Sequence, residues 1–282
     1  MILVTGATGN VGTLLVGELV KGGHQVRAFV KDAAKAKRKL GEGVTLAIGN
    51  LDDRSSVEAA VVGVEKIYLL AGGGDVVKWD ATVIDAAKRV GVRHVVKHSV
   101  LGAQWENITS GRWHRAGEKH LEASGLAWTH VRPGGFFSNA LEWAGMIKTQ
   151  GAIFLPQGSG KSASIDPRDI ASVAARVLTT PGHEHKAYDI TGPELLGGDD
   201  HASAIADAIG KPVRYVDVPE SAAKQAMVGR GIPAQVADVL LEFSALVRSG
   251  TATMMTDTVK TVTGHPARTF AAWAKENAAA FQ

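Results

Sequence analysis

Three glycines near the start of the chain have the type and spacing needed to bind a phosphate-containing ligand. Residues 1–4 are apolar and predict a short buried strand, which runs directly into Thr5-Gly6-Ala7-Thr8-Gly9-Asn10-Val11-Gly12. Apolar residues then recur at helical spacing up to Gly22-Gly23, which predicts a helix that ends there. A strand, a glycine-rich turn and a helix form the context of a dinucleotide fingerprint. The alternative is a turn that merely joins a strand to a helix.

Each glycine of this turn has a separate task in such a site. Gly6 allows a sharp turn, Gly9 lets the backbone approach a pyrophosphate, and Gly12 lets the helix lie close to the strand. The helix N-terminus also offers N–H groups to phosphate oxygens. We therefore predict that the diphosphate of a dinucleotide is bound by Gly6, Thr8, Gly9, Asn10, Val11 and Gly12.

The end of the second predicted strand, at 24–30, is the position that distinguishes NAD from NADP. An acidic side chain there accepts from the ribose 2′-hydroxyl of NAD, whereas a cation neutralises the 2′-phosphate of NADP. The strand ends on Lys31, with Arg27 and Lys35 as further cations nearby in the sequence. Asp32 is one residue late and would repel the phosphate if it pointed inwards. We predict that NADPH is preferred and NAD is possible, the alternative being an exposed Lys31 with no role.

Further strands are predicted at 44–48, 64–70 and 92–99, with a helix at 81–90 before the last of them. This alternation predicts an α/β fold, a doubly wound parallel sheet of the Rossmann type with right-handed crossovers. In such sheets ligands bind at the carboxyl ends of the strands. The loops at those ends therefore add Asn50, Leu51, Ala71, Gly72 and Gly73 to the predicted cofactor site. The alternatives are a helix cap at the first loop and a flexible glycine loop at the second.

The second half of the chain predicts a smaller domain. A strand at 126–131 is broken by Arg132-Pro133-Gly134-Gly135 at the same sheet edge, so Pro133 and Gly134 are also expected beside the cofactor. A helix start at 166–170 and a strand at 186–191 follow, and from residue 192 short helices dominate. We predict a NAD(P)-binding domain of residues 1–133, rejoined by about 165–191. Residues 134–164 and 192–282 would form a mostly helical, substrate-side domain.

Aromatic residues concentrate in one part of the chain. Six of the sixteen lie within 105–143, namely Trp105, Trp113, Trp128, Phe136, Phe137 and Trp143. Trp128 lies in the middle of a predicted strand and is expected in the core. The others either line a pocket for a flat apolar substrate or pack under loops. We predict a substrate pocket that contains Phe136, Phe137 and Trp143.

Composition excludes several classes of protein. The net charge is only +3 and the basic residues are dispersed among 282 positions, which argues against a nucleic-acid surface. No cysteine is present, so disulfides, thiolate metal sites and a cysteine nucleophile are excluded. The histidine pairs His94/His98 and His183/His185 lack further ligands, and we predict no metal. No apolar stretch has membrane-spanning length and the chain begins with a strand, so we expect a cytoplasmic monomer or homodimer.

Three stretches together resemble the NmrA-like atypical branch of the short-chain dehydrogenases. They are the turn at 6–12, with its glycine spacing of three and three, the strand end Val30-Lys31-Asp32, and Arg132-Pro133-Gly134-Gly135-Phe136-Phe137-Ser138-Asn139. The segment His114-Arg115-Ala116-Gly117-Glu118-Lys119 is most similar to the type 2 quinone oxidoreductases and triphenylmethane reductases. The resemblance implies a Rossmann fold and an NAD(P) cofactor. It implies either reduction of quinones, dyes or plant phenolics, or cofactor sensing without turnover.

The resemblance also directs attention to one helix. Members of the wider superfamily place a tyrosine four residues before a lysine, and Tyr68, Tyr188 and Tyr215 all lack that lysine. On the corresponding helix His114 and Glu118 share a face, whereas Lys119 is rotated about 140° from His114. His114 would then be nearest the substrate, as a proton donor or polar anchor. The alternative is a surface histidine paired with Glu118.

Ser99, at the end of its predicted strand, matches the superfamily serine that hydrogen-bonds a substrate oxygen, unless it is simply a strand-end cap. The candidate catalytic residues are therefore His114, Ser99 and Glu118. Hydride addition to a quinone gives a delocalised anion that needs little help from an acid, whereas an isolated ketone gives an alkoxide that needs much. We predict an NAD(P)H-dependent oxidoreductase for a small aromatic acceptor, a quinone or dye-like compound. The alternative is a non-catalytic NADP-binding redox sensor.

Overall fold

The structure is a computed structural model that describes residues 1–72 and 75–282. The chain divides into two compact units. The first contains Met1–Pro133, Pro167–Asp189 and Thr261–Gly264, and the second contains Gly134–Asp166, Ile190–Lys260 and His265–Gln282. The chain passes between the two units after residues 133, 166 and 189, and the predicted boundaries were at residues 133, 164 and 191. The short return of the chain to the first unit near its C-terminus has no counterpart in the prediction.

The first unit is built on a sheet whose strand order among the described residues is β3-β2-β1-β4-β5-β6-β8. The strands are β1 Ile2–Val4, β2 Val26–Val30, β3 Thr45–Ile48, β4 Lys66–Leu69, β5 His94–His98, β6 Ala127–Pro133 and β8 Lys186–Ile190. Neighbouring strands from β3 to β6 pair in parallel. The order reverses between β1 and β4, which creates the crevice where such sheets bind ligands. The predicted Rossmann fold is confirmed.

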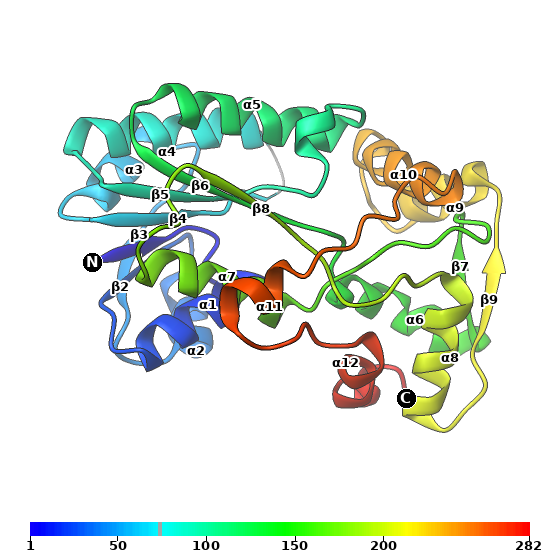
Figure 1. Cartoon of the computed structure of the whole chain (residues 1–282). Coiled ribbons are helices and arrows are strands. Elements are labelled where there is room, and N and C mark those ends of the chain that lie inside the picture. Colours follow the sequence, from blue (N-terminus) through cyan, green and yellow to red (C-terminus); the bar gives the residue numbers. More distant parts are fainter. Residues whose placement is uncertain (73–74) are drawn as a thin grey trace. The chain divides into compact units, whose positions relative to one another are not determined.

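Helices cover both faces of this sheet. They are α1 Asn10–Lys21, α2 Ala33–Leu40, α3 Arg54–Val61, α4 Val76–Val90, α5 Thr109–Ala123 and α7 Pro167–Thr179, with a short 3-10 turn, η1, at Ala103–Trp105. α3, α4 and α5 lie on one face, and α1 and α7 lie together on the other (Figure 1). α4 begins five residues before its predicted start because the Asp75 side chain accepts a hydrogen bond from the Lys78 backbone N–H.

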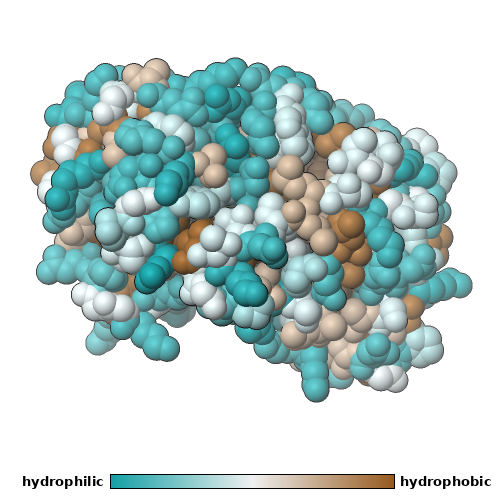
Figure 2. Space-filling view, viewed as in Figure 1, coloured by the Kyte–Doolittle hydropathy of each residue, from teal (hydrophilic) through white to brown (hydrophobic). Residues whose placement is uncertain are grey.

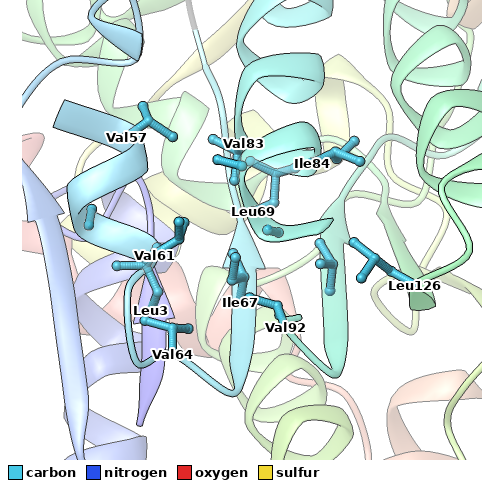
Figure 3. Close-up of a cluster of buried hydrophobic side chains, with 14 of the residues drawn as sticks. Leu3, Val57, Val61, Val64, Ile67, Leu69, Val83, Ile84, Val92 and Leu126 are labelled. Atoms are coloured by element: carbon cyan, nitrogen blue, oxygen red, sulfur yellow. The ribbon is translucent and has the colours of Figure 1, made fainter. Parts of the chain in front are cut away.

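The core on the α3–α5 side of the sheet explains why alternate strand residues are apolar. Val83 and Ile84 of α4 point toward Leu69 of β4, and Ile67 lies further along the same strand (Figure 3). These side chains are at most 1% exposed. Burying a branched apolar side chain contributes about 1.5–3 kcal/mol. The packed layer therefore fixes the strands whose carboxyl ends carry the predicted ligand loops.

The second unit is mostly helical around a two-stranded parallel ribbon, β7 Ala152–Leu155 and β9 Arg214–Asp217. β7 was not predicted, because four apolar residues beside a short helix gave no clear period. Its other elements are η2 Phe137–Trp143, α6 Ala144–Gln150, α8 Gly198–Ile209, α9 Glu220–Gly229, α10 Ala234–Arg248, α12 Phe270–Glu276 and η3 Ala278–Ala280. In α11, Thr258–Thr263, the chain passes from the second unit to the first.

Hydrophilic side chains predominate on the face of the molecule shown in Figure 2. Within 1–72 and 75–282, no helix has both the length and the apolar character that a bilayer crossing requires. Among the large apolar side chains that remain exposed are Trp105 and Trp113, at 51% and 41%. Single exposed apolar residues are ordinary, but two exposed tryptophans in the first unit are noteworthy because this residue is usually well buried.

Candidate functional site

The glycine turn (residues 6–12) has the geometry of a dinucleotide-binding turn. Gly6 has φ +61°, in the left-handed region that glycine adopts without strain, and its carbonyl oxygen accepts from the Gly9 N–H at 3.0 Å. A Cβ on Gly12 would lie 2.1 Å from that same oxygen, so no side chain fits there. A Cβ on Gly9 would meet only the Gly6 oxygen within 4 Å. The turn therefore packs too closely on its own helix for a side chain at Gly12, whereas there is open space beside Gly9.

The first turn of α1 follows immediately. Its N-cap residue is Gly9, which has no side chain to cover the N–H groups there. Val11 is 2% exposed, so its side chain is in the core and only its backbone faces the turn. Thr8 is half-buried, and its carbonyl oxygen accepts from Lys39 Nζ at 3.0 Å. Exposed N–H groups at a helix start, beside a cation, are suited to an anionic ligand.

A pocket of about 360 Å³ opens beside this turn in the first unit. Its lining comes from the turn, from the carboxyl ends of β2, β3 and β4, and from one residue each of α2 and α4: Gly6, Ala7, Thr8, Phe29, Val30, Lys31, Asp32, Lys35, Gly49, Leu51, Leu70, Gly72 and Trp79. Apolar walls, open backbone and two lysines match the parts of a nucleotide: a base, a diphosphate and a further phosphate. These residues fit the adenosine diphosphate part of NADPH.

The charged rim of the pocket agrees with a 2′-phosphate. Lys31 Nζ lies 5.9 Å from the centre of the Trp79 ring, close enough for a cation–π contact. The Asp32 side chain caps α2 by accepting from the Lys35 backbone N–H at 2.9 Å, and this hydrogen bond lowers the pKa of the Asp32 carboxyl. Arg27, in contrast, donates to the carbonyl oxygens of Ala60 and Val62 and does not line the pocket.

Two loops of the predicted cofactor site have their own local structure. Asn50 Oδ1 accepts from the Asp52 N–H at 3.2 Å, and the cap of α3 is Asp53, so Asn50 does not cap the helix. Leu51 lines the pocket, whereas Asn50 does not. After β4, Gly72 lines the pocket and Ala71 packs against Val76 and Trp79. Gly73 lies outside the described residues.

The two predicted cofactor residues at the end of β6 fall on either side of the break between the units. The Pro133 carbonyl oxygen accepts from the Leu101 N–H at 2.8 Å in the first unit. The Gly134 N–H donates to the Ile190 carbonyl oxygen at 3.0 Å in the second. Their contact with a cofactor stays a prediction.

His114 lies on α5 against a buried ion pair. Its Nδ1 is 3.5 Å from Lys97 Nζ, and Lys97 Nζ is 2.5 Å from Asp80 Oδ2. Lys97 and Asp80 are fully buried, and His114 is half-buried. Burial and then the Lys97 charge hold the pKa of His114 well below its usual value. The imidazole is therefore neutral at pH 7.

Glu118 is the centre of a second buried group. Its carboxylate accepts two hydrogen bonds from Arg132 at 2.7 Å, one from the Ser99 hydroxyl at 2.6 Å and one from Arg115 at 3.0 Å. Burial alone would raise the pKa of Glu118, but the Arg132 and Ser99 hydrogen bonds and nearby positive groups bring it to about 2. We call this group, together with Asp80, Lys97 and His114, the polar network.

This geometry does not support a direct catalytic contact from Ser99 or Glu118. Ser99 is fully buried and its hydroxyl proton is committed to Glu118, so it is not available to a substrate oxygen. Glu118 is likewise fully buried, and its partners are Arg132, Arg115 and Ser99 in place of the His114 pairing considered from the sequence. Lys119 is exposed and pairs with Glu106 at 2.5 Å, whereas His114 contacts the buried Lys97.

One trio in this region has the spacing of metal ligands: Glu118, Glu122 and His130 offer atoms within 4.8 Å of one another. Arg115, however, donates to both carboxylates, at 3.0 and 2.6 Å, and Arg132 binds Glu118 as well. The guanidinium groups already supply the positive charge that the carboxylates need.

The predicted substrate-pocket aromatics lie in the second unit. Phe137 is 2% exposed and packs edge-on against Phe270, with ring centres 5.2 Å apart, in the core of that unit. Trp143 is half-buried and stands 5.4 Å from the His201 ring, and Phe136 is half-buried beside Ile165. For Phe137 the structure favours the packing alternative.

The fold and the site define a class: an α/β protein with a Rossmann sheet and a glycine-rich turn that suits the diphosphate of a dinucleotide. The NmrA-like family model matches residues 1–273, and the chain belongs to that family. The predicted family is thereby confirmed.

Known relatives resemble the chain over its whole length. It is 43% identical over 283 residues to an NAD(P)H azoreductase of Xenophilus azovorans, covering 100% of this chain and 99% of that protein. It superposes with TM-score 0.90 and 30% identity on an NADPH-dependent quinone oxidoreductase of Escherichia coli complexed with NADPH, covering 98% and 99%. A triphenylmethane reductase of Citrobacter sp. complexed with NADP(H) gives 0.88 and 26%, covering 99% and 100%.

Proposed function

We propose that this protein is an NADPH-dependent oxidoreductase that reduces small planar aromatic acceptors, quinones or azo compounds. NADPH, when bound, supplies a hydride, and one further proton converts a quinone to a hydroquinone while NADP⁺ is formed. The observation that carries the proposal is the glycine turn, closed at Gly12 and open at Gly9, beside a pocket with Lys31 at its rim. The named relatives, which are reductases of azo compounds, quinones and triphenylmethane dyes, support the acceptor class.

The glycine turn and the pocket bind different parts of the cofactor. The backbone of residues 6–12 and the first turn of α1 hold the diphosphate. Phe29, Leu51 and Trp79 provide apolar walls for the adenosine. Lys31 and Lys35 bind the 2′-phosphate, and the Asp32 carboxylate is engaged in capping α2. NADPH is therefore bound in preference to NADH.

The acid groups of the chain suit an acceptor whose reduced form is a delocalised anion, because such an anion needs little help from an acid. Tyr68 is fully buried and hydrogen-bonds His98 Nδ1 at 2.6 Å, and burial raises the pKa of its phenol. It is therefore not a proton donor to a substrate. His114 is the remaining candidate on α5, and because it is neutral it serves as a hydrogen-bonding anchor for the acceptor.

Trp105 and Trp113 take the place of Phe137 in the proposed acceptor contact. Both are exposed aromatics of the first unit, on η1 and on the α5 residue that precedes His114. Trp113→Ala should raise the KM for a quinone several-fold with little change in unfolding temperature. Phe137→Ala is the control. Its loss of core packing should lower the free energy of unfolding by about 3–5 kcal/mol and the unfolding temperature with it. Phe136 and Trp143 stay predicted pocket residues.

The proposal includes a cytoplasmic location and a monomeric or homodimeric state. The absence of cysteine is compatible with a reducing compartment, because the fold needs no disulfide there. Cell fractionation and light scattering of the purified protein check these two points.

The test of the proposed function is NADPH oxidation by the purified protein with a panel of quinones, azo dyes and triphenylmethane dyes. The expected result is oxidation that saturates with at least one acceptor and is slower with NADH. A protein that binds NADPH tightly but oxidises it with none of them would be a cofactor sensor, and the proposal would fail.

A further inference from the structure

The polar network contains a lysine for which the proposed reaction has so far no use. Lys97 is on β5, and its side chain is 1% exposed. A charged lysine is rarely buried unless it is paired, and here its partner is Asp80 of α4, also fully buried. The Asp80 Oδ1 atom has no hydrogen-bond partner among the described residues. Apolar residues of similar size often give equal or higher stability than such a pair, so stability alone does not account for it.

The helix above the ion pair is shaped to accommodate it. Gly117 lies in the interior of α5, where glycine costs about 1 kcal/mol relative to alanine. A Cβ on Gly117 would lie 2.2 Å from Asp80 Oδ2 and 2.9 Å from Lys97 Cε. Because Gly117 has no side chain, the ion pair can pack directly against α5, one helical turn from His114.

The chemistry of the contact determines where the imidazole carries its proton. Lysine has three N–H donors and no acceptor, so Lys97 Nζ can only donate to His114 Nδ1. A neutral imidazole that accepts at Nδ1 carries its hydrogen on Nε2. The two nitrogens point in divergent directions, so the Nε2–H group faces away from Lys97.

The remaining charges near His114 leave this assignment unchanged. His98, on the same strand as Lys97, opposes protonation of His114, as burial and Lys97 do. Glu118, on the same helix, favours protonation, but its carboxylate is hydrogen-bonded to Arg132, Ser99 and Arg115. Burial and the Lys97 charge are the two largest influences, and both favour the neutral ring.

We propose that Lys97, held by Asp80, is a positioning residue that fixes His114 as the neutral tautomer with its hydrogen on Nε2. His114 then acts as a hydrogen-bond donor to the acceptor oxygen or nitrogen and does not deliver the proton, which comes from solvent. The catalytic part of this inference rests on the proposed function, whereas the tautomer itself does not.

The test is the nitrogen NMR spectrum of histidine-labelled protein without cofactor, with the His114 signals assigned by their loss in His114→Gln. At neutral pH the expected spectrum shows an unprotonated Nδ1 and a protonated Nε2 for His114. In Lys97→Met combined with Asp80→Asn, which removes both buried charges, the two tautomers should mix and the pKa of His114 should move toward its ordinary value. Turnover should fall roughly 3- to 10-fold, as expected when a positioned donor loses its orientation, with an unchanged KM for NADPH.

Lys66→Met is the matched control, because it removes a lysine from the neighbouring strand β4 whose ammonium donates to the Leu178 carbonyl oxygen. It should leave the His114 signals and turnover unchanged. The proposal is overturned by a protonated Nδ1 in the parent protein, or by a tautomer or turnover that does not change in the Lys97→Met/Asp80→Asn protein. If the parent shows the expected tautomer but oxidises NADPH with no acceptor, the proposed function fails and the tautomer assignment stands.

Discussion

The glycine turn and the polar network, both in the first unit, present opposite kinds of groups. The turn offers backbone atoms from seven consecutive residues, and its shape depends on side chains that are absent, as the 2.1 Å approach at Gly12 shows. The network is made of charged and polar side chains from α4, β5 and the residue after it, α5 and β6, which meet only in the folded sheet. The turn is open beside Gly9, where a ligand can approach its backbone, whereas most of the network is hydrogen-bonded within itself.

This difference has a consequence for evolution of function on the fold. A turn that binds through its backbone depends little on the side chains at its non-glycine positions, so cofactor binding tolerates changes there. Polar atoms buried in a network cannot change singly, because each partner left unpaired costs about 1–3 kcal/mol or more. We expect changes of acceptor to arise at exposed positions around the network, such as Trp113, and not within it.

The largest expected effect comes from the network. Glu118→Gln leaves Arg132 without its close buried counter-charge, and should lower the free energy of unfolding by about 3–5 kcal/mol. Denaturant unfolding of the two proteins measures the difference. Glu122→Gln is the control, because its carboxylate is only part-buried and should cost much less. Equal losses from both changes would remove the distinction between them.

The same carboxylate gives the network a pH dependence. The pKa of Glu118 is about 2 in the folded protein and near 4.5 when the side chain is free, so it binds a proton more weakly in the fold. Its contribution to stability is therefore complete above about pH 4.5 and is lost as the pH falls toward 2. Unfolding measured between those values should show a steeper loss for the parent than for Glu118→Gln. Parallel curves would contradict the assigned ion pair.

The glycine turn should separate binding from stability. Gly9→Val adds a side chain on the open side, so NADPH affinity should fall about 100-fold or more while the unfolding temperature changes little. Gly12→Val should lose both, because its Cβ would collide with the Gly6 carbonyl oxygen. Gly17→Ala, at a helix position with nothing within 4 Å, serves as the control. Calorimetric titration and thermal unfolding provide the two measurements.

Substitution of His114 tests whether the network contributes to catalysis. His114→Ala should lower turnover roughly 10- to 100-fold, below the usual range for a positioned acid because the acceptor needs little help. His114→Gln, which keeps a donor, should lose less, and Lys119→Ala should do little since Lys119 pairs with Glu106 on another face. If His114→Ala leaves turnover unchanged and Lys119→Ala abolishes it, the catalytic residue of this helix is Lys119.

The smallest effect concerns the rim of the pocket. Lys31→Asp should change the ratio of NADPH to NADH affinity by about 10-fold or more, toward or past equality, because one cation is replaced by a carboxylate. Titration with 2′,5′-ADP and 5′-AMP isolates the 2′-phosphate from the rest of the cofactor. Equal affinities for these two ligands in the parent protein would remove the basis of the predicted preference.

The sequence was sufficient where a function depends on neighbouring residues. The strand, the turn at 6–12 and helix α1 are contiguous, and their glycine spacing predicted the geometry found at Gly6 and Gly12. The sequence was insufficient where partners are distant along the chain. Nothing near Glu118 indicated Arg132 or Ser99, and the His114 contact with Lys97 depends on the register of β5 under α5. Phe137 could not be assigned to the core without Phe270, which is 133 positions away.

The proposed reaction requires that the protein bound to NADPH passes its reducing equivalents to an aromatic acceptor. The most direct measurement is a single-turnover experiment in which the NADPH-loaded protein is mixed with a simple benzoquinone. We expect NADPH absorbance to fall as hydroquinone forms, one for one, and the Gly9→Val protein to show no such phase. NADPH that stays bound and unoxidised with quinone, azo and triphenylmethane acceptors alike would contradict it.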